Sequence, residues 1–407
     1  MPSVIAWLDQ SAEHQRRARE LVRLFSETEA RDELGIGQIR DVFSNRLFPG
    51  VSVIQTRARY FLMVPWVFQL HEGRGRTGAD LLRRVQNTER QFIEVLRAEG
   101  ATRGLIGVQA GVNVKILPSA IYWGGLTQFG ILTQPLAADE LGRSSSFADL
   151  DPEATEELAL RARSHWHRGL PDPPEGFPDS MPGGFTLTPE EAAWLREVID
   201  TSSPGTLLSH LMQGVEAPAA ASPWEDPVAL SADGLVLEVL EDARLFSLAV
   251  HGAALLYNLL LAEAYVAGGF DAVGDQTDYY REALSDWVDQ VQMSTDELAR
   301  WDLDSWWAGV FEHNPRINRL TQVFVTEWVA RTRAGGLAGL ADDRGARELV
   351  ANREYLQKKS QSRLRNQRLL RTWQGSSGAA PLVYRWGTVK DLVTDVVTAR
   401  EVAGAPA

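Results

Sequence analysis

The stretch LVLEVLEDARLFSLAVHGAALLYNLLLAEAYVA, residues 235–267, decides the fold of this chain. Its length and apolar content predict one long helix. Polar residues interrupt the most apolar part, 245–267, and acidic residues precede it. Because charged groups are costly inside a bilayer, they favour a buried core helix over a membrane span. The interrupting residues are Ser247, His251, Asn258 and Glu263, and the preceding ones are Glu238, Glu241 and Asp242.

Apolar residues at helical spacing recur on both sides of this stretch. Thr188, Pro189 and Glu191 mark a helix start, with a capping hydroxyl, a proline in the first turn and a glutamate three residues after the cap. Strand patterns are scarce. The chain is therefore predicted to be mainly α, with two multi-helix units and few short strands. Other helices are predicted at 11–27, 39–47, 77–98, 277–291, 317–333, 344–371 and 389–402.

The domain organisation is predicted from length and from one Pro- and Gly-rich segment. A chain of 407 residues is long enough for two or three domains. The segment 171–187 is the strongest linker candidate. We therefore predict an N-terminal helical domain at 1–170, a linker or loop at 171–187 and a C-terminal helical domain at 188–407.

Composition limits the chemistry that this chain can perform. It has no cysteine, which excludes disulfides, thiolate zinc sites and cysteine nucleophiles. Its net charge of −13 argues against a polynucleotide bound over the whole surface. No secretion signal is visible, so a cytoplasmic protein without membrane contact is predicted. No nucleotide fingerprint or metal-protease motif is present, so no cofactor and no metal are predicted.

Positive charge is concentrated in one segment, 353–371, which holds seven cations and the single carboxylate of Glu354. A cationic patch on an acidic protein has an anionic partner, either a polynucleotide or an acidic face of the same chain, such as 139–157. Aromatic residues follow it, and rings beside arginines suit base stacking and phosphate contact. The predicted nucleic-acid or anion-binding residues are Arg353, Lys358, Lys359, Arg363, Arg365, Arg368, Arg371, Trp373 and Arg385.

A second candidate is a line of polar residues on the long apolar helix: Arg244, Ser247, His251 and Asn258. Their spacing places them within roughly 60° of one another around the helix. Such a line could bind an anion or accept a proton, or it could be a hydrogen-bonded seam between two buried helices.

Weaker candidates remain. Gly73–Gly78, with two arginines ahead of a helix, could cradle a phosphate or be a surface loop. His165 and His167 make a poor metal pair, because residues two apart on a helix face different ways.

Five short stretches resemble the signature of an uncharacterised bacterial family, domain-of-unknown-function family 6361. They are RDELGIGQIRDVF (31–43) with LFPG (47–50), QTRARYFLMVPW (55–66), and LPSAIYWGG (117–125) with Tyr384-Arg-Trp386. The resemblance spans nearly the whole chain. It implies an association with helicase and phospholipase-D-like genes in bacterial defence regions, but no reaction.

Together these observations favour a nonenzymatic component of an anti-phage defence or DNA-processing system. It would bind DNA, RNA or a partner protein, such as a helicase, through a basic C-terminal helix. One alternative is a phosphoesterase or nuclease that uses His251 with Arg244, or magnesium held by Glu238, Glu241 and Asp242. Another is a scaffold that assembles defence proteins through exposed Trp306 and Trp307.

Overall fold

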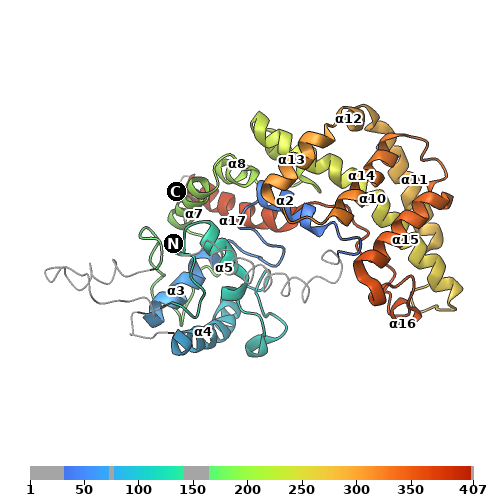
Figure 1. Cartoon of the computed structure of the whole chain (residues 1–407). Coiled ribbons are helices and arrows are strands. Elements are labelled where there is room, and N and C mark those ends of the chain that lie inside the picture. Colours follow the sequence, from blue (N-terminus) through green and yellow to red (C-terminus); the bar gives the residue numbers. More distant parts are fainter. Residues whose placement is uncertain (1–31, 73–77, 142–164, 405–407) are drawn as a thin grey trace, which may run out of the picture. The chain divides into compact units, whose positions relative to one another are not determined.

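The computed structural model describes residues 32–72, 78–141 and 165–404. The fold is mainly α, as predicted (Figure 1). Within the described residues there is no β-strand, and the one extended pairing is an isolated antiparallel bridge between Leu132 and Trp166. The predicted helix at 11–27, the loop residues 73–77 and most of the acidic stretch 139–157 lie outside the described ranges.

The chain forms two compact units, and each is built from segments that are distant in sequence. Unit 1 takes its described residues from Leu47–Val236 and Arg385–Ala407, and unit 2 takes its own from Val22–Arg46 and Leu237–Tyr384. This division differs from the predicted one, because 171–187 runs inside unit 1 and the last helix returns to unit 1. The two divisions differ because the units are defined by contacts between distant segments, and sequence composition does not show such contacts.

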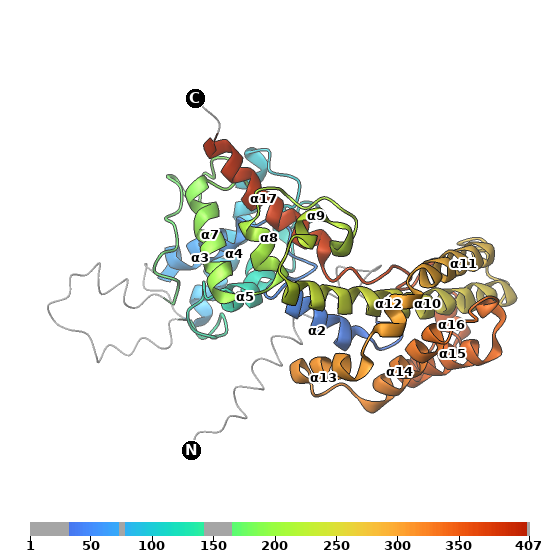
Figure 2. The same ribbon diagram turned by 90° about the horizontal axis from the view of Figure 1, so that it is seen from above.

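Unit 1 consists of α-helices, among them α3, α7 and α17 (Figure 2). Helix α3 packs against α4 and α5, and α7 packs against α8 and α17. Gly125 in α5 lets the backbone at Gly50 approach closely, because a Cβ at position 125 would lie 2.6 Å from the carbonyl oxygen of Gly50. The helices are α3 (Tyr60–Glu72), α4 (Gly78–Ala98), α5 (Pro118–Gln128), α7 (Pro189–Ser202), α8 (Leu207–Gln213), α9 (Pro227–Leu230) and α17 (Trp386–Gly404), with η1 (Gly111–Asn113) and η3 (Pro223–Glu225).

The predicted start of α7 is confirmed. The Thr188 hydroxyl accepts from the amide of Glu191, and the Glu191 carboxylate accepts from the amide of Thr188, which completes a capping box. The same carboxylate accepts from the buried Arg59 guanidinium at 2.8 Å. A second Arg59 nitrogen donates to the carbonyls of Pro182 and Gly184. The segment 171–187 is therefore an ordered loop of unit 1 and not a linker.

Unit 2 is built around the long apolar helix (Figure 1). The indole of Trp287 donates to the carbonyl of Leu248, and that of Trp328 donates to the carbonyl of Ala249, so two neighbouring helices are fixed to the core helix. The helices are α2 (Gly37–Leu47), α10 (Gly234–Ala267), α11 (Thr277–Met293), α12 (Thr295–Arg300), α13 (Leu303–His313), α14 (Arg319–Arg333), α15 (Arg344–Lys358) and α16 (Gln367–Leu370), with η4 (Leu340–Asp342) and η5 (Lys359–Gln361).

Helix α10 is the one described helix that is long and apolar enough to cross a membrane by length and composition. Of its most apolar 18-residue window, 78% is buried inside the protein. This burial agrees with the predicted core helix, because lipid-facing residues of a spanning helix would be exposed in the isolated chain.

Candidate anion-binding surface

The basic segment is not one helix, so the predicted helix at 344–371 is wrong beyond Lys358. Helix α15 ends at Lys358, and the short helix η5 follows it. Helix α16 then begins at Gln367, and its N-cap residue Asn366 accepts hydrogen bonds from two backbone amides. Lys359 has φ 52° and ψ −118°, which breaks the helix. The Glu354 carboxylate then accepts from the Ser362 hydroxyl and from the backbone amide of Arg363 at 2.7 Å. Together these contacts turn the chain out of helical geometry.

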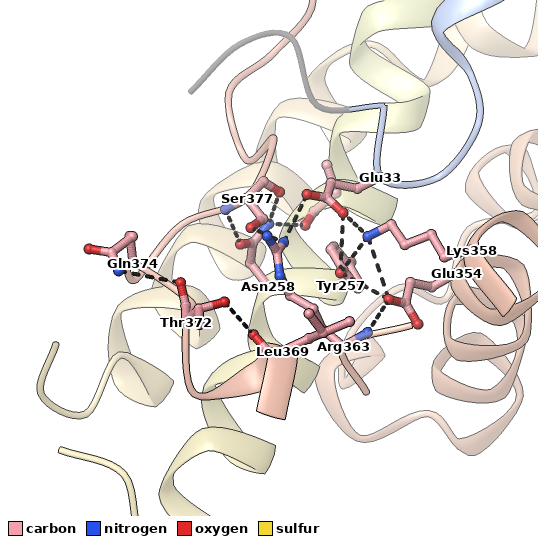
Figure 3. A network of polar contacts seen from close by, with 11 residues as sticks. Glu33, Tyr257, Asn258, Glu354, Lys358, Arg363, Leu369, Thr372, Gln374 and Ser377 are labelled. Carbon is pink, nitrogen blue, oxygen red and sulfur yellow. Dashed lines mark hydrogen bonds and ion pairs between the residues drawn. The ribbon is translucent and has the colours of Figure 1, made fainter. Parts of the chain in front are cut away.

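Two of the predicted cations are neutralised inside unit 2 by a buried polar network (Figure 3). Lys358 forms an ion pair with Glu33 and lies 3.5 Å from the Glu354 carboxylate. Arg363 forms an ion pair with the other Glu33 oxygen at 2.9 Å. The hydroxyl of Tyr257 lies 3.4 Å from both carboxylates. Lys358 and Arg363 therefore hold the fold of unit 2 together and are not free for an outside ligand.

The chain after α15 is also held to helix α10, through hydrogen bonds that join Arg363, Ser377 and Asn258. The Arg363 guanidinium donates to the Ser377 hydroxyl at 2.7 Å. The Asn258 side chain donates to the Ser377 carbonyl and accepts from the Ser377 amide. Burial raises the pKa of the Glu354 carboxyl, and hydrogen bonds from Ser362 and Arg363 oppose that rise.

Arg353 is also engaged within the fold. Its side chain is 3% exposed and donates to the carbonyls of Leu34 and Gly35 and to the Thr321 hydroxyl. Burial lowers the pKa of this guanidinium from its usual value. Arg353 therefore holds the Leu34–Gly35 turn against α15, and it is removed from the predicted binding set.

Four cations of the segment remain exposed: Lys359, Arg365, Arg368 and Arg371. We call them the cationic loop surface. Within the described ranges none of the four forms an ion pair. The Tyr355 ring, on the last turns of α15, lies beneath two of them: the Arg365 guanidinium carbon is 3.8 Å from its centroid and the Lys359 ammonium is 5.6 Å away. Four exposed cations without an ion pair on one short segment make it a candidate anion-binding surface.

The aromatic residues predicted to flank this surface are not available for stacking. Trp373, Tyr384 and Trp386 are each at most 2% exposed. The ring of Trp373 packs against Tyr265 within unit 2. Arg385 belongs to unit 1, where it donates to the carbonyl of Val51 at 2.7 Å. Trp373 and Arg385 are therefore removed from the predicted binding set, because the Trp373 ring is buried and the Arg385 guanidinium donates to a backbone carbonyl.

The polar line on α10 does not form one site. Arg244 forms ion pairs with Glu241 and Glu297, and Ser247 is buried. The His251 ring nitrogen lies 3.0 Å from the carbonyl of Ala379, and burial lowers its pKa. Arg244 is thus held by carboxylates of α10 and α12, whereas His251 and Asn258 bond to the segment that follows α16, so these three groups have separate partners.

The groups behind the alternative functions are similarly engaged. Asp242 accepts from the Trp301 indole, and the described residues contain no group of three His, Asp or Glu side chains that could hold a metal ion. Trp306 is 2% exposed and so cannot serve as the exposed docking residue that the scaffold alternative needs. Its neighbour Trp307 is half-buried and stacks on Phe311.

Sequence reasoning missed the residues that organise this surface: Glu33, Tyr257, Ser377 and Tyr355. The signal for Glu33 was present, because it stands in the DELGIG motif beside Leu34 and Gly35. Tyr355 stands four residues before Lys359, which is one helical turn. No pattern in the sequence marks Tyr257 or Ser377, since their partners come from distant segments.

The fold and this surface define a mainly helical protein in which one segment, 359–371, exposes four cations that form no ion pair within the described residues. The chain belongs to a family of unknown function, DUF6361, whose model matches residues 2–400. No curated protein and no solved structure matches the chain.

The backbone of Lys359 yields a prediction. Positive φ with strongly negative ψ is a region that L side chains rarely adopt, and glycine adopts it freely. We expect Lys359→Gly to be more stable than Lys359→Ala by about 1 kcal/mol in urea unfolding. Equal stabilities, or a more stable alanine variant, would contradict a strained backbone at this position.

Proposed function

We propose that this protein is a nonenzymatic component of a bacterial anti-phage defence or DNA-processing system that binds nucleic acid through the cationic loop surface. The observation that supports binding is that Lys359, Arg365, Arg368 and Arg371 are exposed and have no ion pair in the described part of the chain, although the protein has a net charge of −13. The defence context rests on the family resemblance alone. A helicase is the partner protein that this context suggests.

The neighbours of the four cations also favour a polynucleotide. Gln361, Gln367 and Thr372 are exposed on the same segment and offer uncharged hydrogen-bonding groups between the cations. Phosphate and sugar contacts in nucleic-acid complexes come from cations and from such polar side chains together. The acidic remainder of the protein limits the contact to this local surface, because it repels a polyanion elsewhere.

The test is binding of labelled DNA and RNA across a salt series. We expect wild-type affinity to fall as salt rises, and the variant with all four cations changed to Glu to bind at least ~100-fold more weakly at low salt. The slope of log affinity against log salt should decrease in magnitude by about three.

A matched control changes four other exposed arginines of unit 2 to Glu: Arg300, Arg316, Arg319 and Arg344. Both variants alter net charge equally, so only a local site separates them. Equal loss in the two variants, or no binding by the wild type, would refute the proposal.

A further inference from the structure

The cationic loop surface contains one stacked pair, Arg365 on Tyr355. The guanidinium carbon lies 3.8 Å from the ring centroid, closer than any other cation that lies over a ring in the described residues. Tyr355 is half-buried on α15, so the ring is held by a regular element, whereas Arg365 is exposed. One side of the guanidinium is therefore covered by the ring, and the side chain remains accessible to solvent.

A planar guanidinium fixed on a ring is a platform for another flat group. Arginine stacks on nucleobases through its plane, whereas lysine is a point charge without a face. The ring beneath restricts the side chain before the ligand arrives, which lowers the entropy lost on binding. The other three cations are then left to contact the phosphates that flank the stacked base.

We propose that the ligand of this surface is single-stranded nucleic acid, with one base stacked on Arg365 and the adjacent phosphates bound by Lys359, Arg368 and Arg371. This inference rests on the proposed function. A paired base inside a duplex has both faces covered by its neighbours, so a stacking platform selects unpaired bases. Stacking tolerates any base, because every base has a π face, so little sequence preference is expected.

The experiment compares Arg365→Lys with Arg368→Lys. Both variants keep the charge and both positions are exposed, but only the first removes a stacked plane. The probes are a single-stranded oligonucleotide, a blunt duplex of the same length and an abasic strand with the same number of phosphates. Binding is measured by fluorescence anisotropy at one salt concentration.

We expect Arg365→Lys to weaken binding of the single strand about 10-fold and Arg368→Lys to change it less than about 2-fold. The two variants should bind the abasic strand with equal affinity, because that strand has no base to stack. The wild type should prefer the single strand to the duplex.

Equal effects of the two variants on the single strand, or a duplex bound as tightly as the single strand, would overturn base stacking. The proposed function would survive that result, because the four-site charge reversal tests it separately. Absence of binding to all three probes would reject both proposals.

Discussion

Replacing Glu354 with Ala is expected to destabilise unit 2 by about 3 kcal/mol. The carboxylate is fully buried and accepts from the Ser362 hydroxyl and the Arg363 amide, and it lies 3.5 Å from the Lys358 ammonium. Its removal leaves those donors without their acceptor, and Glu33 must then balance both cations alone. Removing one member of a buried ion pair lowers the stability of the fold by more than the intact pair raises it, because the remaining charged groups stay desolvated.

Glu348→Ala is the matched control for this prediction. It makes the same substitution on the same helix, but Glu348 is exposed and pairs with the exposed Arg344, so no measurable loss is expected. Hydrogen exchange of peptides from α15 and 359–371 measures unit 2 apart from unit 1. Unchanged exchange in Glu354→Ala would mean that the network does not stabilise this loop.

The same variant connects the network to the proposed function. The Glu354 carboxylate fixes the turn at Ser362 and Arg363, which lies between Lys359 and Arg365, so its loss should also weaken nucleic-acid binding. Preserved affinity in Glu354→Ala would show that the cationic loop surface needs no fixed backbone.

Changing Glu89 to Gln is expected to stabilise unit 1 at pH 8 and to leave it unchanged near pH 4.5. Glu89 is 4% exposed beside Val64, Phe92 and Ile93, and burial raises the pKa of its carboxyl to about 7, opposed by hydrogen bonds from the Ser119 hydroxyl and amide. The folded state therefore holds this proton more tightly than the unfolded state, whose pKa is near 4.5.

The sign of the pH effect follows from that difference. The stability contributed by protonated Glu89 is complete below about pH 4.5 and is lost as pH rises through about 7, which amounts to about 3 kcal/mol. Glutamine stays neutral and can keep both contacts with Ser119, so the variant avoids the loss. Urea unfolding of both proteins from pH 4.5 to 8 measures the difference between them.

Glu94→Gln on the same helix is the control, because the Glu94 side chain is 56% exposed and its ion pair with Arg97 is screened by solvent, so the substitution should change stability little. A Glu89→Gln variant that is less stable than the wild type at pH 8 would mean that the ionised carboxylate is the favoured form in the fold.

Local patterns predicted about half of the described α-helices, including α4, α7, α10, α11, α14 and α17. Apolar spacing and the capping residues Thr188 and Glu191 depend on neighbours within a few positions, and both predictions agree with the structure. The basic segment was harder, because Glu354 stops its helix by bonding to Ser362 and Arg363, eight and nine residues away. Spacing rules for a helix do not include a side chain that turns the chain back on itself.

Sequence alone determined the helical class, the buried core helix 235–267 and the concentration of positive charge between 353 and 371. Only the tertiary structure decided which of those charges are free. Glu33 lies more than 300 residues from Lys358 and Arg363, and folding places its carboxylate against both. An ion pair depends on distance in space, so charge counted along a chain can show that a cationic surface exists but not which of its cations remain unpaired.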